Sequence, residues 1–210
     1  MRYLDPKNDL IFKKVFGEHP DILMSLLNAM LPLSSNQLIV FLEYLPAEMV
    51  PELPLMKNSI VDVRCLDNHG RQFIVEMQML WTDSFKSRVL FNASKAYVKQ
   101  LDKGVNYIGL QPVYALSIVN ETFEKDMDEW YHHYRMVHVG DSYKVIDGLQ
   151  LVFIELPKFK AKNYSDKKLS VLWMRFLSEI ENQTEMISED LMEVPEIAKA
   201  VELTKESSKT

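Results

Sequence analysis

The order of apolar and polar residues along the chain predicts a three-layer domain of the α/β or α+β class around a mixed β-sheet. Residues 60–78 form two alternating segments on either side of a polar turn, as in two paired strands. Residues 113–119 form an unbroken apolar segment, which is typical of a buried strand. Residues 83–103, between them, repeat their apolar positions with the period of a helix. Strands interleaved with amphipathic helices in this order place the sheet between helical layers.

The remaining elements follow from the same periodicities. Short helices are expected over residues 7–16 and 21–30, and a short strand over residues 38–41 is followed by a proline-marked loop. Two further strands are expected over residues 131–139 and 149–156, joined across Gly140 and the Asp147-Gly148 turn. An amphipathic helix is expected over residues 166–181. We therefore predict one domain over residues 1–181 and an acidic C-terminal segment over residues 182–210, helical or disordered and outside the core.

The predicted hairpin has one polar face on each strand. Asp62 shares a face with Arg64 on the first strand, and Glu76 shares a face with Gln78 and Ile74 on the second. If the two faces coincide, two carboxylates and an amide converge among apolar residues. Buried acids are costly unless they are paired or bind a metal, and a carboxylate pair suits a hard cation such as Mg²⁺. The alternative is a half-exposed hairpin whose polar face meets water.

Composition indicates an ordinary globular protein. The chain has 210 residues, of which 47% are hydrophobic and 26% charged, enough for one substantial core. It has no apolar run long enough for a membrane span, and its first residues lack the apolar segment of a signal peptide. The single Cys65 has no partner for an internal disulfide, which favours a reducing, cytoplasmic location. No phosphate-binding glycine motif is present, so a nucleotide cofactor has no support.

The net charge of −6 is concentrated at the C-terminal end. From residue 178 onward there are nine acids and three lysines, which leaves residues 1–177 with no net charge. A neutral domain with local basic patches can still bind a phosphate backbone, although without long-range attraction.

The helix over residues 83–103 carries a polar row within about a quarter of its circumference. The row consists of Arg88, Asn92, Lys95, Lys99 and Lys103. Such a row could contact DNA phosphates, and Arg88 is the best candidate because its guanidinium matches phosphate oxygens. The alternative is an ordinary solvated face of an amphipathic helix.

Two other polar groups have simpler interpretations. Asp9 and Lys13 are four residues apart on a predicted helix, where an exposed ion pair is the ordinary explanation. His132, His133 and His138 invite a zinc interpretation, but neighbouring strand residues point to opposite faces and no cysteine lies nearby. We therefore expect no zinc site there.

The chain resembles the PD-(D/E)XK nuclease superfamily, and within it the Rpn-like group of recombination-promoting nucleases and transposases. The resemblance covers about the first 120 residues in register. It rests on Asp9–Gly17, Leu26-Leu27-Asn28, Asp62, Val75-Glu76-Met77-Gln78, Arg88, Tyr97, Gly104–Tyr107 and Pro112–Ile118. The implied fold is the three-layer restriction-endonuclease-like core with a mixed central sheet.

The resemblance also implies an activity, a cofactor and a partner. Asp62, Glu76 and the backbone carbonyl of Met77 would hold Mg²⁺, with Mn²⁺ as a substitute, and the substrate would be DNA. Gln78 would orient the attacking water, and Asp9 would supply an additional acid. The chain departs from the superfamily motif in two places, since Gln78 replaces a lysine and Val61 replaces a proline. Glutamine hydrogen-bonds without carrying a charge, whereas the proline shapes the backbone and does no chemistry.

Three functions are compatible with the sequence. The first is a metal-dependent endonuclease, with a link to recombination or transposition that only the resemblance supplies. The second is a nuclease fold without catalysis that binds DNA or a protein partner. In the third, the acidic segment inhibits a nuclease by covering the basic row. A homodimer is compatible with the sequence, which does not define target specificity.

Overall fold

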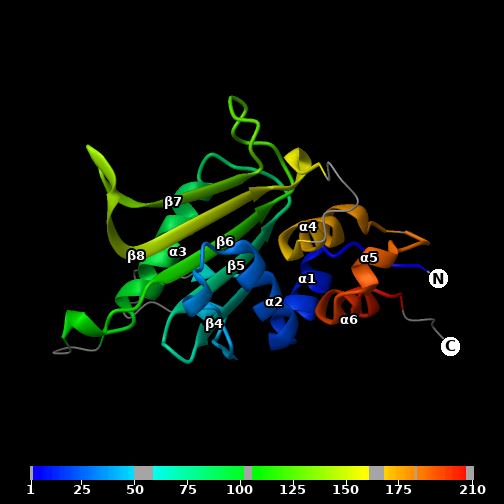
Figure 1. Ribbon diagram of the computed structural model, residues 1–210, viewed down its shortest axis with the longest axis horizontal. Helices are drawn as coiled ribbons and strands as arrows, with labels where there is room; N and C mark the ends of the chain where they lie inside the picture. The colour runs from blue at the N-terminus through cyan, green and yellow to red at the C-terminus, as the bar shows by residue number, and fades with distance from the viewer. Residues whose placement is uncertain (1, 50–58, 102–105, 161–167, 183, 207–210) are drawn as a thin grey trace.

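A six-stranded mixed sheet forms the centre of the protein in the computed structural model (Figure 1). The structure describes residues 2–49, 59–101, 106–160, 168–182 and 184–206. The strand order is β1-β4-β5-β6-β8-β7, and the β5–β6 and β6–β8 pairs are parallel. The strands are β1 (Leu42–Tyr44), β4 (Val63–Asp67), β5 (Gln72–Gln78), β6 (Val113–Val119), β7 (Tyr131–His138) and β8 (Asp141–Glu155). A separate two-stranded ribbon pairs β2 (Glu48–Met49) with β3 (Ser59–Ile60).

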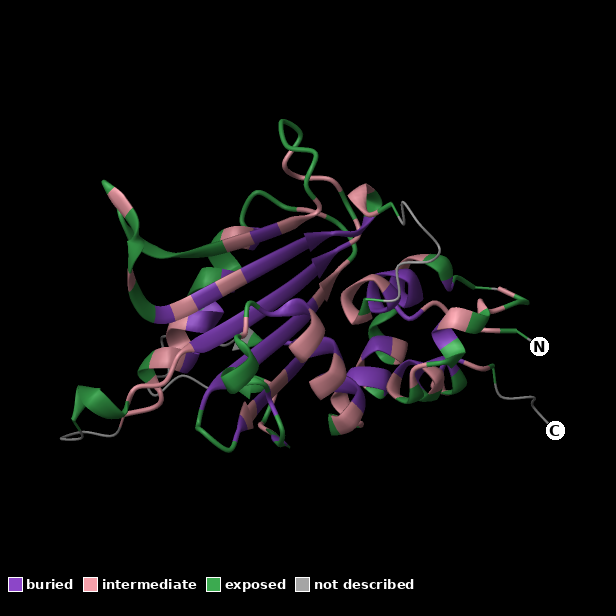
Figure 2. Ribbon diagram, in the orientation of Figure 1, coloured by how far each residue is buried: buried purple, intermediate pink, exposed green. Residues whose placement is uncertain are grey.

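Helices cover both faces of the sheet, which confirms the predicted three-layer class. One face packs against α1 (Asp9–Gly17), α2 (Pro20–Met30), α4 (Leu169–Glu179) and α6 (Pro195–Leu203), and the other packs against α3 (Phe85–Val98). Single-turn elements complete the set: η1 (Ser35–Gln37), η2 (Tyr107–Gly109), η3 (Leu156–Lys158) and the short α5 (Glu189–Met192). Because both faces are covered, all seven residues of β6 are buried, as its unbroken apolar sequence predicts (Figure 2).

The hairpin predicted over residues 60–78 is confirmed as β4 and β5. Their antiparallel register pairs Val63 with Val75 and Cys65 with Phe73. Gly70 in the connecting turn has a φ of 78°, a left-handed conformation that a residue without Cβ adopts easily. The chain then crosses over through α3 to reach β6, which lies parallel to β5. The crossover places α3 against the face that carries Glu76.

The strand expected over residues 38–41 is absent, and β1 begins at Leu42 instead. The side chain of Asn28 explains the shift. Its Oδ1 accepts the backbone N–H of Ile39 and its Nδ2 donates to the carbonyl of Ile39, both at 2.8 Å. These bonds use the backbone groups of Ile39 that strand pairing would need.

The second half of the sheet also differs from the prediction. β8 begins at Asp141 rather than at residue 149, so β7 and β8 form one long hairpin that turns at residues 139–140. Asp147 and Gly148 lie inside β8 at an irregularity, because Arg135 pairs with Gln150 while the next residue, Met136, pairs with Ile146. The predicted helices over 83–103 and 166–181 are shorter, at Phe85–Val98 and Leu169–Glu179. Gly104, expected to end the first of them, lies outside the described residues.

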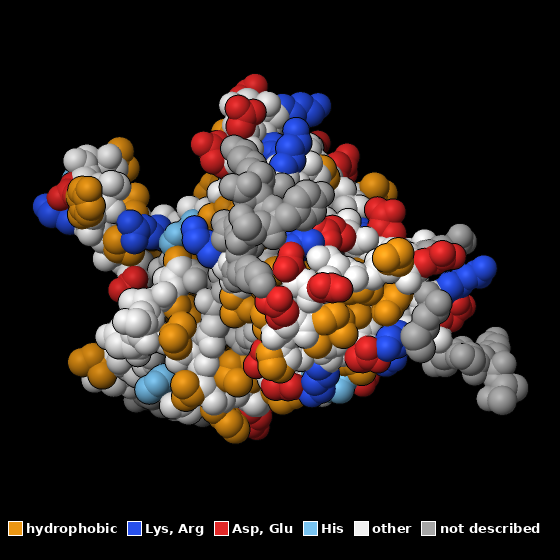
Figure 3. All heavy atoms as spheres, turned by 45° about the vertical axis from the view of Figure 1, so that its right-hand side comes forward, with side chains coloured by type: hydrophobic (Ala, Val, Ile, Leu, Met, Phe, Trp, Pro, Cys, Tyr) orange, Lys and Arg blue, Asp and Glu red, His pale blue; other side chains and the backbone are white. Residues whose placement is uncertain are grey.

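The C-terminal segment packs into the core, so the expectation that it lies outside the core is wrong. Leu191, Ile197, Ala200 and Val201 are at most 1% exposed and belong to the same hydrophobic cluster as α1 and α2. The described acidic side chains of the segment are exposed or half-buried. Figure 3 shows acidic side chains on the face of the molecule that it displays. The segment is helical over α5 and α6, and the division of the chain after residue 181 remains a prediction. None of the described helices is long and apolar enough to cross a membrane.

Candidate active site

The hairpin brings Asp62 and Glu76 to the same place. Asp62 directly precedes β4, whose first residue Val63 pairs with Val75, the residue before Glu76. The Oδ2 atom of Asp62 accepts a hydrogen bond of 2.7 Å from the backbone N–H of Met77. The negative charge of Asp62 also acts on the Glu76 carboxyl. The two predicted polar faces therefore coincide.

Glu76 is buried with few hydrogen-bond donors around it. It is 6% exposed, and its Oε1 accepts one bond of 3.3 Å from Nδ2 of Asn92 on α3. Burial raises the pKa of Glu76 to about 7, and the charge of Asp62 adds to this, while Arg88 and Asn92 act in the opposite direction. Burial also raises the pKa of Asp62, although the Met77 N–H and Lys13 partly compensate. The nearby positive charges therefore offset the burial of the two carboxyls only in part.

Two cations reach the carboxylates from opposite helical layers. On the α1 side, Nζ of Lys13 lies 2.7 Å from Oδ1 of Asp9 and 3.6 Å from Oδ1 of Asp62. On the α3 side, the exposed Arg88 donates from Nη2 to Oε1 of Gln78 at 2.7 Å. The sequence predicted the Asp9–Lys13 pair but not its contact with Asp62, because only the tertiary fold brings α1 to β4.

Gln78 lies at the end of β5, two residues after Glu76. Its Oε1 accepts from Arg88, and its Nε2 donates to the backbone carbonyl of Leu80. The amide is therefore held in one orientation at the edge of the site, next to a guanidinium that also stacks 4.7 Å from the ring centroid of Phe85.

The predicted basic row is only partly present as an exposed surface. Asn92 is 2% exposed and bonds Glu76, so its assignment to an exposed DNA-contacting row is corrected: it lies at the edge of the buried face of α3. Lys95 is half-buried and donates to the backbone carbonyl of Met49. Lys99 directly follows α3. Lys103 lies outside the described residues.

Asp9 contributes to the site through Lys13. Its side chain is 63% exposed and forms the ion pair with Lys13. Among the described residues, no group of three or more His, Cys, Asp and Glu side chains is placed to hold a metal ion. The structure thus brings together two carboxylates, and the predicted catalytic role of Asp9 remains a prediction.

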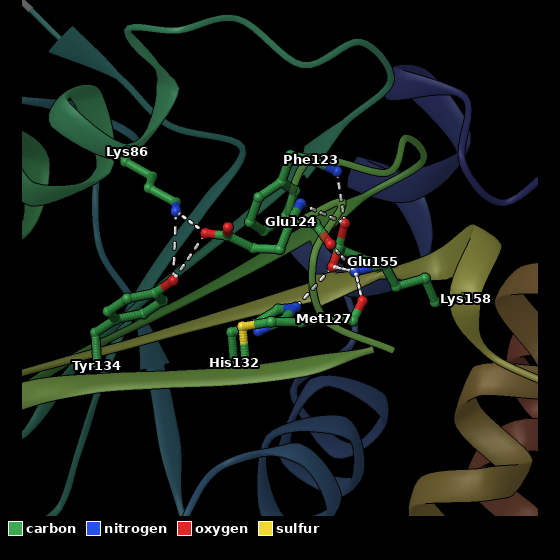
Figure 4. Close-up of polar contacts among 8 residues, drawn as sticks. All are labelled: Lys86, Phe123, Glu124, Met127, His132, Tyr134, Glu155 and Lys158. Carbon is green, nitrogen blue, oxygen red and sulfur yellow. Dashed lines mark hydrogen bonds and ion pairs between the residues drawn. The ribbon is translucent and has the colours of Figure 1, made fainter. Parts of the chain in front are cut away.

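A second buried glutamate, Glu155 at the end of β8, has hydrogen-bond or ion-pair partners on both of its carboxylate oxygens (Figure 4). Its Oε2 lies 2.7 Å from Nε2 of His132 and 2.6 Å from Nζ of Lys158, and its Oε1 accepts the backbone N–H groups of Phe123 and Glu124. Burial alone would raise the pKa of Glu155, but these hydrogen bonds outweigh burial and lower it below the ordinary value. This network fastens the loop after β6 to β7 and β8.

The three histidines considered for zinc have separate partners. His132 bonds Glu155, His133 lies 2.7 Å from Oε1 of Gln150, and Nδ1 of His138 accepts from the backbone N–H of Gly140. They are therefore engaged in strand pairing and loop contacts at three different points of β7.

A mixed sheet between helical layers, with an acidic pair on the hairpin β4–β5 and a glutamine at the end of β5, defines a PD-(D/E)XK nuclease-like fold. The model of the PD-(D/E)XK nuclease family transposase matches residues 6–210, and the chain belongs to this family. The match includes α5 and α6, in agreement with their packing into the core. No curated protein and no solved structure matches the chain. Membership of the family supports a nuclease-like or transposase-related function.

Proposed function

We propose that this protein is a metal-dependent DNA endonuclease that hydrolyses phosphodiester bonds. The observation that carries the proposal is the incompletely compensated pair formed by the half-buried Asp62 and the buried Glu76. A nuclease of this family acts on DNA, and PD-(D/E)XK nucleases generally use divalent metals such as Mg²⁺.

The comparison of the two buried glutamates supports the assignment. Glu155 receives two side-chain cationic or imidazole donors and two backbone N–H groups, whereas Glu76 receives one amide donor at 3.3 Å. A folded protein that compensates one buried carboxylate so fully has no structural reason to leave the other with a pKa near 7. Binding of a cation by Asp62 and Glu76 would explain the difference.

The donor atoms fit a hard divalent cation. Asp62 and Glu76 offer carboxylate oxygens, and the N–H of Met77 points toward Asp62. Since the N–H and C=O of one strand residue lie on the same edge, the carbonyl of Met77 faces the same side. Oxygen donors of this kind are those that Mg²⁺ and Mn²⁺ prefer. When bound, the metal would lower the pKa of a water molecule and stabilise the charge that develops on the phosphate.

The neighbouring residues would complete the chemistry. Gln78 orients the attacking water through its fixed amide, and Arg88 contacts the scissile or a neighbouring phosphate. In the reaction the water oxygen bonds to phosphorus, one phosphorus–oxygen ester bond breaks, and the leaving oxygen takes up a proton. Lys95, Lys99 and Lys103 would supply further phosphate contacts.

The test is cleavage of plasmid DNA with Mg²⁺ or Mn²⁺, run in parallel with thermal unfolding. Asp62→Ala and Glu76→Ala should abolish cleavage, and Glu76→Ala should also remove the metal-dependent rise in Tm. Glu43→Ala is a matched control, since Glu43 is an exposed acid on the neighbouring strand β1. If the wild type and both site variants give the same trace activity, the proposal is wrong.

A non-catalytic DNA-binding module is the second candidate. The observation that favours it is the neutral Gln78 at the motif position that holds a lysine in the superfamily. Metal binding without cleavage, with DNA binding retained, would establish that candidate instead. The proposed inhibition by the acidic segment has less support, because α6 packs with α1, α2 and α4 on the face opposite α3.

A further inference from the structure

Gln78, a neutral amide, occupies the motif position that holds a lysine in the superfamily, but the ammonium group of another residue lies near Asp62. Lys13, on α1, approaches Asp62 to 3.6 Å, although 49 residues separate them in the chain. We infer that Lys13 supplies to phosphodiester hydrolysis the positive charge that Gln78 lacks, as a catalytic residue that contacts the scissile phosphate. This inference rests on the proposed nuclease function.

The packing of α1 fixes the direction of Lys13. Phe12, Val15 and Phe16 are at most 1% exposed and anchor α1 in the core. The Lys13 side chain is 42% exposed, so it contacts the carboxylates and is also open to the solvent from which DNA arrives. The end of α1 also lies against β4, since a Cβ at Gly17 would be 3.7 Å from the Val63 side chain. The ammonium is thus delivered to the start of β4 by a well-packed helix.

The contacts of Lys13 leave hydrogen-bonding capacity for a substrate. An ammonium has three N–H donors. Asp9 takes one at 2.7 Å, whereas the 3.6 Å to Asp62 is longer than an ordinary hydrogen bond. A phosphate oxygen that enters beside Asp62 therefore meets a charged group with free donors.

The arrangement of charges gives Lys13 a task that Arg88 does not perform. Arg88 lies on the α3 side, engaged with Gln78 and the Phe85 ring, and Lys13 lies on the α1 side. When water attacks phosphorus and the ester bond breaks, negative charge increases on the phosphoryl oxygens. Lys13 stays protonated throughout and stabilises this charge from the side opposite Arg88, while the leaving oxygen takes its proton from solvent water. An exposed Asp9–Lys13 pair alone would contribute little to stability and gives no reason for the approach to Asp62.

The experiment uses four full-length variants: Lys13→Ala, Lys13→Arg, Lys14→Ala and the double variant Lys13→Ala/Gln78→Lys. Lys14 is the matched control, because it is the adjacent lysine of α1 and its ammonium binds the carbonyl of Leu203 instead of the carboxylates. The double variant returns an ammonium to the motif position on the same strand face as Glu76. Each is measured for kcat on plasmid DNA at saturating substrate, for the Kd of DNA, and for the rise in Tm with Mn²⁺.

Lys13→Ala should lower kcat by about 100-fold, the scale of losing one oriented donor to the reacting phosphate, with the Kd of DNA changed by less than about 3-fold. Lys13→Arg should keep part of the activity, Lys14→Ala should keep all of it, and Lys13→Ala/Gln78→Lys should recover at least about 10-fold over Lys13→Ala. The rise in Tm with Mn²⁺ should persist in Lys13→Ala, because the carboxylates remain.

Three results would overturn the inference. The first is a kcat of Lys13→Ala within about 3-fold of the wild type, and the second is a kcat of the double variant no higher than that of Lys13→Ala. The third is loss of the rise in Tm with Mn²⁺ in Lys13→Ala, which would mean that Lys13 only supports Asp62. In each case the wild type would still cleave, and the proposed function would stand. A wild type no more active than Asp62→Ala would overturn both.

Discussion

The substitution Glu76→Gln tests whether the fold carries an uncompensated carboxyl. The pKa of Glu76 in the folded protein is about 7, compared with an ordinary value of 4.5. A difference of about 2.5 corresponds to about 3 kcal/mol at 1.36 kcal/mol per pKa unit, which we take as an upper limit. Because the raised pKa means that the folded state holds the proton more tightly, the free energy of unfolding falls as the pH rises from about 4.5 to about 7. Above pH 7 the full penalty is present.

Glu76→Gln removes this penalty while keeping an oxygen that can accept the bond from Asn92. In EDTA at pH 8 the variant should be more stable than the wild type by up to about 3 kcal/mol, which corresponds to a rise in Tm of about 6–12 °C for a chain of this length. At pH 4.5 or below the difference should disappear, because both side chains are then neutral. The assay is thermal unfolding at both pH values, and excess Mg²⁺ at pH 8 should stabilise the wild type only.

The control is Glu43→Gln, which changes an exposed acid on β1 and should alter stability by less than about 0.5 kcal/mol at either pH. If Glu76→Gln is equally destabilising at pH 4.5 and pH 8, burial does not penalise the Glu76 charge. Asp62 and Glu76 would then have no electrostatic need for a bound cation.

Three further outcomes are expected. Gln78→Ala should lower kcat about 30-fold, equivalent to about 2 kcal/mol of transition-state stabilisation, with little change in the Kd of DNA; unchanged kcat would mean that the amide has no catalytic role. Arg175→Ala should lower the free energy of unfolding, measured in urea, by about 2–3 kcal/mol. The reason is that Arg175 of α4, whose side chain is 2% exposed, forms an ion pair of 3.1 Å with Asp190 of α5. A change below about 0.5 kcal/mol would show that this ion pair is dispensable. Gly70→Ala should cost about 1–2 kcal/mol because of its φ of 78°, since among the described residues an added Cβ would meet only Gln111, at an ordinary contact distance of 3.6 Å. Equal stability in urea would show that the turn relaxes.

Local patterns were sufficient to predict the centre of the sheet and the acidic pair. The alternation along residues 60–78 predicts the polar face of each strand, and the strand register then brings the two faces together. The apolar run of β6 follows from burial on both sides. The assignment of Asn92 failed because a helical wheel cannot locate the edge of the buried face: on α3 that face includes Asn92 together with Ala93 and Ala96.

Contacts between distant segments were not accessible from the sequence. The approach of Lys13 to Asp62 depends on how α1 docks, and no local pattern encodes it. The C-terminal helices were misjudged because acidic composition concealed a few well-spaced apolar residues, of which Ile197 and Val201 are fully buried. The strand expected over residues 38–41 does not form for a similar reason, since Asn28 bonds the backbone of Ile39, eleven positions away.

The packing of α6 against α1 has a consequence for the order of events during synthesis. Lys14 donates to the carbonyl of Leu203, the N–H of Leu4 donates to the carbonyl of Thr204 at 2.8 Å, and Tyr3 forms a bridge with Lys205. The first helix thus has a binding partner 189 residues further along the chain. A nascent chain can form the β4–β5 hairpin with both carboxylates early, but α1, with Lys13, has its complete docking site only once α6 has emerged. The fold thereby couples assembly of the site to synthesis of the chain as far as α6.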